Sequence, residues 1–271
     1  MTAPVARLLC SELRWVFRRP RTLIALGVLA VVPIAMGIGV ATTSENQGGD
    51  DFLITEAIRN GLVLPIAALA ATMLLLLPLV VSMSAADALA GESAHGTLRA
   101  LLLAPVGRIR LVAVKAAGVL SVTTVAVVVI VTVGLLTGLL LIGTSGQLLT
   151  LSGTTLTTAE AFGRIAILAA WVIVQMAAVG AVALAISAVT EHPLVVMAVT
   201  VGSLILITVL GAIEALDWLH PVLLPTGWEV LADVLRDPMP WDGLLLSSYR
   251  AACYLLIGLS LTIARMATRD A

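Results

Sequence analysis

The feature that most constrains this chain is a series of six apolar runs separated by polar stretches. Each run is about 18 residues or longer, enough for a helix to cross roughly 30 Å of hydrocarbon. Backbone polar groups in lipid must be satisfied within the segment itself, so runs of this kind predict helices. They occupy residues 22–40, 62–82, 111–143, 165–189, 194–213 and 244–264. The chain is therefore expected to be an all-α integral membrane protein with six transmembrane helices.

Composition narrows the function classes. The 271 residues are 60% hydrophobic and 11% charged, whereas soluble domains carry about 25% charged residues. No room remains for a soluble catalytic domain, so residues 1–271 are expected to form a single transmembrane domain. The net charge of -1 and the scattered basic residues argue against a nucleic-acid partner. Cys10 and Cys253 fall in separate regions, which argues against a disulfide framework.

Two amphipathic segments accompany the runs. Residues 4–19 place apolar side chains on one helical stripe and arginines on the other, which predicts a helix lying in the membrane interface. The alternative is an ordinary charged tail. Residues 217–243, called here the outer segment, hold three of the five tryptophans and are expected to be interfacial. Thr226 and Glu229 have capping-box spacing, which predicts a short helix from about Gly227.

The length of the third run and the short turn between the fourth and fifth runs predict how the spans are arranged. Residues 111–143 would form a helix of about 50 Å, so this span must tilt or project beyond the membrane. Gly134 and Gly138 within it form a GxxxG spacing that permits close helix approach; coincidence is the alternative in a chain with 22 glycines. The very short turn at residues 191–193 predicts that spans four and five are antiparallel neighbours.

Orientation follows from the distribution of the fifteen basic residues over a six-span topology. Eleven fall on the side of both termini: Arg7, Arg14, Arg18, Arg19, Arg21, Arg99, Arg108, Arg110, Lys115, Arg265 and Arg269. Four fall on the other: Arg59, Arg164, Arg236 and Arg250. The side richer in Lys and Arg is cytoplasmic. Both termini are therefore expected in the cytoplasm, and the chain is expected to be a multi-pass protein of the plasma membrane.

Enzyme signatures are missing from the sequence. It contains no GxxxxGK[ST] phosphate loop, since the only lysine, Lys115, follows valine. The three histidines are far apart and suggest neither a zinc site nor paired haem ligands: His95, His192 and His220. No catalytic, cofactor-binding or metal-binding residue is therefore expected.

Few polar groups lie inside the apolar runs or at their ends, where ionisable residues usually mark function. The candidates are Gln175, Glu214 and Arg250, and none forms a recognisable catalytic pair. Glu214 and Arg250 are both expected in the outer half of the membrane, where they could form an ion pair. The alternative is that Arg250 extends alone toward the interface.

The segment AGESAHGTLRALLLAPVGRIRLVAVK follows the second run and is the most specific motif in the chain. It resembles the cytoplasmic signature of ABC type-2 transporter permeases, in which an acidic residue precedes Gly-Thr-Leu, an apolar helix, Pro, Arg and a basic residue. The matching positions are Glu92, Gly96, Thr97, Leu98, Arg99, Pro105, Arg108 and Lys115. The layout of the whole chain is similar too. A second acidic residue common in the family is replaced here by Ala94 or His95.

The resemblance implies a permease subunit of an ABC exporter. Because its path would be lined mainly by apolar spans, an amphipathic or lipidic cargo is expected. ATP and Mg would be bound by a separate ATPase subunit, with no cofactor in this chain. A second permease subunit, identical or related, would complete a dimer within membrane lipid. Residues 84–110 would form the cytoplasmic coupling segment. The residues implied to contact the ATPase are Glu92, Gly96, Thr97, Leu98, Arg99, Leu101 and Leu102.

Alternatives remain at both levels. The coupling segment could lie on the lipid surface without a partner, although an apolar stripe next to water, here Leu98, Leu101 and Leu102, favours a protein contact. The whole chain could instead be an intramembrane enzyme or a non-ABC membrane scaffold. An intramembrane enzyme would need polar catalytic groups inside the bilayer, and the apolar runs offer few of them.

Overall fold

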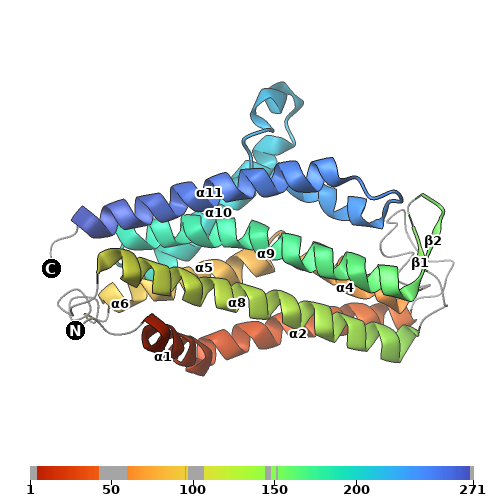
Figure 1. Cartoon of the computed structure of the whole chain (residues 1–271), viewed down its shortest axis with the longest axis horizontal. Coiled ribbons are helices and arrows are strands. Elements are labelled where there is room, and N and C mark those ends of the chain that lie inside the picture. Colours follow the sequence, from red (N-terminus) through yellow and green to blue (C-terminus); the bar gives the residue numbers. More distant parts are fainter. Residues whose placement is uncertain are drawn as a thin grey trace.

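The computed structural model describes residues 5–42, 60–94, 96, 107–143, 148–150 and 152–268. Long helices run side by side, with α1 and the last turn of α11 at one end and the β1–β2 hairpin at the other (Figure 1). Within the described residues, five helices are long and apolar enough to cross a membrane, and a bent helix pair makes a sixth candidate. The predicted all-α membrane fold is confirmed.

The helices overlap all six apolar runs. The spans are α2 (Pro20–Thr42), the bent pair of η2 and α4 (Gly61–Val63 and Leu64–Met73) with α5 (Leu76–Ala88), α8 (Arg108–Thr137) with the π-helical turn η3 (Gly138–Ile142), α9 (Thr158–Val189), α10 (Pro193–Gly211) and α11 (Trp241–Thr268). The shorter elements are α1 (Val5–Arg18), α6 (Ala90–Ala94), β1 (Leu148–Leu149), β2 (Thr155–Leu156), η4 (Glu214–Leu219) and η5 (Pro225–Leu235).

The second span is bent by 58° between its two halves. The break falls at Leu74 and Leu75, directly before α5. Pro78 explains the position, because proline has no N–H to donate to the carbonyl four residues earlier and its ring crowds that carbonyl. That carbonyl belongs to Leu74. The sequence therefore fixes where this helix breaks, and the packing of the two halves sets the angle.

The GxxxG of the third span is a close contact with the second span. A methyl group added at Gly134 would lie 2.9 Å from the Cα of Pro65, and one added at Gly138 would clash with the backbone of Gly61. The N–H of Gly61 also donates to the carbonyl of Gly143 at 3.1 Å. The spacing therefore serves helix packing within the chain, and coincidence is excluded as its explanation.

Helix α11 makes close contacts with α9 and α8. A Cβ at Gly258 of α11 would lie 2.6 Å from the carbonyl carbon of Ala181, so α9 and α11 touch through their backbones. Arg108 Nη1 donates to the carbonyls of Met266 and Ala267, which places the start of α8 beside the end of α11. We call this the α1 end of the bundle. Helix α10 contacts both α9 and α5, as the short turn before it predicted for α9.

The outer segment folds into the 3-10 helices η4 and η5, and one prediction about it was wrong. Thr226 Oγ1 donates to the carbonyls of His220 and Leu223 at 2.9 and 2.7 Å. Helix η5 begins at Pro225 without a side-chain cap. The expected capping box of Thr226 and Glu229 is therefore absent, because the hydroxyl is used to hold the preceding turn.

Candidate functional site: a buried charge cluster at the α1 end

The most unusual site in the described structure is a cluster of three charged side chains, called here the Lys115 cluster: the buried Glu92 and Lys115 and the partly buried Glu12. Lys115 Nζ donates to both carboxylate oxygens of Glu12 at 2.9 Å and to Glu92 Oε1 at 2.5 Å. The lysine side chain is 3% exposed. A charge buried this deeply is tolerated only when it is paired. The cluster thus joins α1, α6 and α8 through one ammonium group.

Each member reaches the cluster for a local reason. Lys115 lies two turns into α8, on the face that packs against α1. Glu12 lies in the apolar stripe of α1, four residues before the buried Val16. Glu92 lies in α6, which continues from α5 after a short break. Residues three or four apart share a helix face, so the apolar packing of α1 carries Glu12 inward with it.

A second ion pair lies beside the cluster. Arg19 Nη1 lies 2.8 Å from Asp87 Oδ2, which joins the α1–α2 corner to α5. The ring of Trp15 has the Arg19 guanidinium 3.2 Å from its centroid and the Lys115 ammonium 5.2 Å from it. Cations over an indole face are stabilised by the ring quadrupole. Trp15 therefore contacts a cation from each of the two ion pairs.

The electrostatic balance of the cluster is asymmetric. Burial raises the pKa of the Glu92 carboxyl above its usual value, and the Lys115 ammonium opposes that shift. With all three groups ionised, two carboxylates face one ammonium. Removing the lysine would leave two like charges buried together, which strongly disfavours ionisation of both. Lys115 is therefore the residue on which the cluster depends most.

Helix α6 is also attached to α9. The N–H of Ala90 donates to Ser187 Oγ at 2.9 Å, and Ser93 Oγ donates to Glu191 Oε1 at 3.3 Å. The segment that follows the second span is thereby connected to α1, α8 and α9 at once. A displacement of α6 would act on three helices through specific polar contacts.

The predicted coupling residues can be followed only in part. Glu92 is buried on Lys115 of the same chain, so its carboxylate is not presented on an open surface. Gly96 has φ +70°, a left-handed conformation that glycine adopts readily. The remaining residues lie outside the described part of the chain: Thr97, Leu98, Arg99, Leu101 and Leu102.

Arg250 has partners other than the expected one. Its Nη1 donates to the carbonyl of Leu223 at 2.5 Å and to Thr226 Oγ1 at 2.7 Å. Glu214 is exposed at the start of η4, and the ion pairs among the described residues do not include it. In this structure Arg250 therefore fastens the outer segment to α11 and does not pair with Glu214.

Gln175, the remaining polar candidate, is 0% exposed in α9. Its side-chain oxygen and nitrogen have no hydrogen-bond partner among the described residues. The same part of the chain holds no group of three or more His, Cys, Asp or Glu that could bind a metal ion. The Lys115 cluster is thus the strongest candidate for a functional site among the described residues.

Sequence reasoning singled out Glu92 and Lys115 separately but missed their pairing, and it missed Glu12, Arg19 and Asp87. Two signals were present. Lys115 is the only charge between residues 111 and 143, and an ionisable residue in such a run requires a partner. Glu12 interrupts the apolar stripe of α1. Which acid meets which base depends on helix packing, and sequence spacing does not reveal it.

The chain matches the family model described as ABC-2 family transporter protein over residues 11–227. A comparison with curated proteins found no match. The matched region begins in α1 and ends in η5, so it contains all three members of the Lys115 cluster.

Proposed function

This chain belongs to the ABC-2 family of transporter proteins, and from that premise we propose that it is the permease of an exporter driven by a separate ATPase subunit. A permease component of an ABC transporter is a membrane subunit and not itself a catalytic enzyme. The family and the apolar helices make it a multi-pass protein of the plasma membrane. The proposal adds the direction of transport, the cargo and the route by which ATP hydrolysis reaches the spans.

The observation that carries the proposal is the bonding of Lys115 to both Glu12 and Glu92. Residues 84–110 are the proposed coupling segment, and Glu92, one of its described residues, reaches the span helix α8 through an ion pair with Lys115. Breaking a buried ion pair by removing one partner costs about 3–5 kcal/mol. A push on α6 is therefore expected to move α8 and α1 with it rather than to slide past them.

The proposed working cycle follows from this connection. Closure of the ATPase on ATP would displace the coupling segment, and the Lys115 cluster would transmit the displacement to α8. A difference in ATPase contacts between two arrangements of the spans is what would shift their populations. The break at residues 74–75 offers a joint between the moving and the fixed halves of the second span. A second permease subunit, identical or related, would complete the transport path.

The proposed cargo is amphipathic or lipidic. The span surfaces are apolar, and exposed side chains such as Ile24 and Val31 of α2 and Leu206 of α10 offer no polar binding groups. A hydrophilic solute would have to be desolvated along such a surface at high cost. A cargo with its own apolar part would not.

The test separates docking from transmission. Glu92→Gln keeps the shape of the side chain but removes its charge, so it should leave ATPase co-purification intact and reduce transport-linked ATP hydrolysis about tenfold, equivalent to about 1.4 kcal/mol. Glu160→Gln, on the exposed first turn of α9 at the hairpin end, is the matched control and should change neither quantity. Normal transport-linked hydrolysis in Glu92→Gln would remove the cluster from the proposed route.

Docking itself is tested at the apolar stripe of the coupling segment. Leu98→Asp places a charge in the proposed contact and should abolish ATPase co-purification while membrane insertion stays normal. Recovery of the ATPase with Leu98→Asp at wild-type yield would mean that the segment lies on the lipid surface instead.

A further inference from the structure

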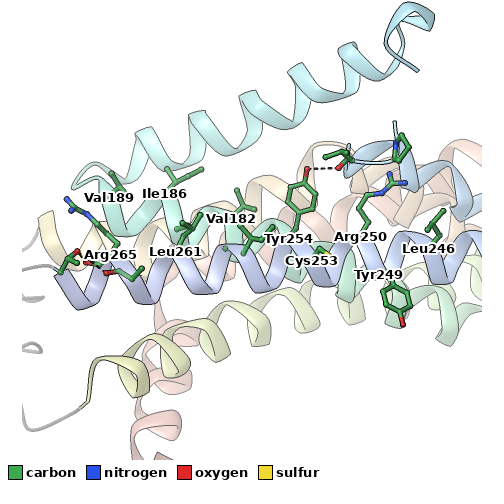
Figure 2. Close-up of a pocket in the computed structure, with 17 residues that line it drawn as sticks. Val182, Ile186, Val189, Leu246, Tyr249, Arg250, Cys253, Tyr254, Leu261 and Arg265 are labelled. Atoms are coloured by element: carbon green, nitrogen blue, oxygen red, sulfur yellow. Dashed lines mark hydrogen bonds between the residues drawn. The ribbon is translucent and has the colours of Figure 1, made fainter. Parts of the chain in front are cut away.

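A long apolar groove lies between α9 and α11 on the outside of the bundle. Its volume is about 1140 Å³, and α11 contributes lining residues from Leu246 to Thr268. That stretch of helix is about 33 Å long, comparable with the roughly 30 Å hydrocarbon core of a bilayer. Side chains labelled on both helices, among them Ile186 of α9 and Leu261 of α11, are seen in Figure 2. We call it the α9–α11 groove.

The groove is concave because a glycine lies between the two helices. A Cβ at Gly258 would lie 2.7 Å from the carbonyl oxygen of Ala181, so only backbone separates α9 from α11 there. Val182 and Ile186 stand on one side of this contact and Ile257 and Leu261 on the other, and all four line the groove. The two helices are thus in contact beneath a channel with aliphatic walls.

The two ends of the groove differ. Toward the hairpin end the outer segment is fastened to α11: Tyr254 Oη donates to the carbonyl of Val222 at 3.0 Å, drawn as a dashed line in Figure 2. Arg250 donates to Thr226 Oγ1 beside it. At the α1 end the groove is lined by Arg265 and Thr268. Arg265 is exposed, and its guanidinium forms no hydrogen bond or ion pair with any described residue.

We propose that the α9–α11 groove binds one phospholipid with an anionic headgroup, its phosphate on Arg265 and its acyl chains along the aliphatic walls. A membrane-spanning surface is surrounded by lipid, and an apolar channel favours acyl chains over water. A guanidinium offers a planar fork of donors that matches phosphate oxygens. Both requirements of such a lipid, an apolar slot and a cation at its end, meet here on adjacent helices.

The position of Arg265 agrees with an anionic ligand. It lies at the α1 end, where Arg108, Arg110 and the arginines of α1 also lie. The sequence predicts this end to be cytoplasmic, and basic sites between spans on that side attract anionic lipid. The arginines of α1 do not line the groove, whereas Arg250 and Arg265 do. Because Arg250 already donates to Leu223 and Thr226 near the other end, Arg265 is the arginine that is open to a lipid phosphate at the α1 end.

The site can be tested with the full-length chain alone, in detergent, without ATPase or ATP. Native mass spectrometry would measure retention of phosphatidylglycerol and of phosphatidylcholine at matched concentrations. One phosphatidylglycerol should remain bound per chain, about tenfold more tightly than phosphatidylcholine, because the choline group of phosphatidylcholine places a second positive charge beside the phosphate, where Arg265 repels it. Arg265→Gln should remove this preference. Arg110→Gln is the matched control, because Arg110 is exposed at the same end but does not line the groove.

The apolar part of the site has its own matched pair on α11. Leu261 lines the groove and is 57% exposed, while Leu256 is 64% exposed and does not line it. Leu261→Trp should fill the slot and lower retention of both lipids, and Leu256→Trp should not. Equal retention of the two lipids that Arg265→Gln leaves unchanged would overturn the proposal.

A second copy of the chain is the competing occupant of the groove. If Leu261→Trp converts dimers to monomers without changing lipid retention, the groove is a subunit interface and the lipid proposal fails. Because no step of the assay depends on coupling, either failure would leave the proposed transport function untouched.

Discussion

Helix α8 is held near its two ends by contacts of opposite kinds. At the α1 end, Lys115 binds Glu12 and Glu92 through ion pairs. Near the hairpin end, Gly134 and Gly138 press against the backbone of the second span without any side chain between them. Charged side chains can exchange partners or gain and lose protons. A close backbone contact has no such alternative, because any movement of one helix into the other produces a steric clash. The comparison suggests that the α1 end transmits movement and the glycine contact anchors it.

The largest effect is expected from removing the shared cation. Lys115→Met should destabilise the chain by about 3–5 kcal/mol, because it leaves buried carboxylates without a counter-charge. Adding Glu12→Gln and Glu92→Gln should recover much of that loss, since a neutral cluster has no unpaired charge to bury. Thermal unfolding in detergent measures both. A triple variant as unstable as Lys115→Met would show that the cluster contributes through packing and not through charge.

A smaller loss of stability is expected from substitution at the glycine contact. Gly138→Leu should cost about 1–3 kcal/mol through overpacking, since the clash is with the backbone of Gly61 rather than with a flexible side chain. Gly202→Leu in α10 is the control, because nothing lies within 4 Å of an added Cβ there. The same unfolding assay applies. Equal stability of the two variants would mean that the second and third spans are not closely packed in the membrane.

A still smaller effect should appear with pH and only at the charged end. Burial raises the pKa of the Glu92 carboxyl, so the folded chain holds a proton there that the unfolded chain has lost. Stability relative to Glu92→Gln should therefore fall as pH rises from about 4.5, the ordinary value, through the raised pKa. Melting temperatures of the two proteins over that pH range give the difference. A difference that grows with pH would reverse the assignment.

The last test measures thiol labelling, with no change in stability expected, and it decides which end of the bundle faces the cytoplasm. With Cys10 and Cys253 replaced by serine, Ser152→Cys at the hairpin end should react with an impermeant thiol reagent added to intact cells. Ala94→Cys in α6 should not react. Outside labelling of the Ala94 position would place the Lys115 cluster on the wrong side for a cytoplasmic ATPase.

Two Thr-x-x-Glu segments show that residue spacing alone does not decide whether a capping box forms. Thr157 and Glu160 have the same Thr-x-x-Glu spacing as Thr226 and Glu229, and only the first pair forms a capping box. Glu160 Oε2 accepts from the N–H of Thr157 at 2.9 Å, on an exposed helix start where nothing competes. The hydroxyl of Thr226 instead holds the turn before it and accepts from Arg250. Tertiary neighbours determined which of two equal local signals was used.

The sequence by itself determined the spans and the family. Apolar length is sufficient to identify a helix in lipid, because the bilayer leaves the backbone no other way to satisfy its hydrogen bonds. Only the tertiary structure decided that Lys115 meets Glu12 and Glu92, that the GxxxG faces the second span, and that Arg265 ends a groove. Those contacts join residues far apart in the chain, and they exist only once the helices have packed.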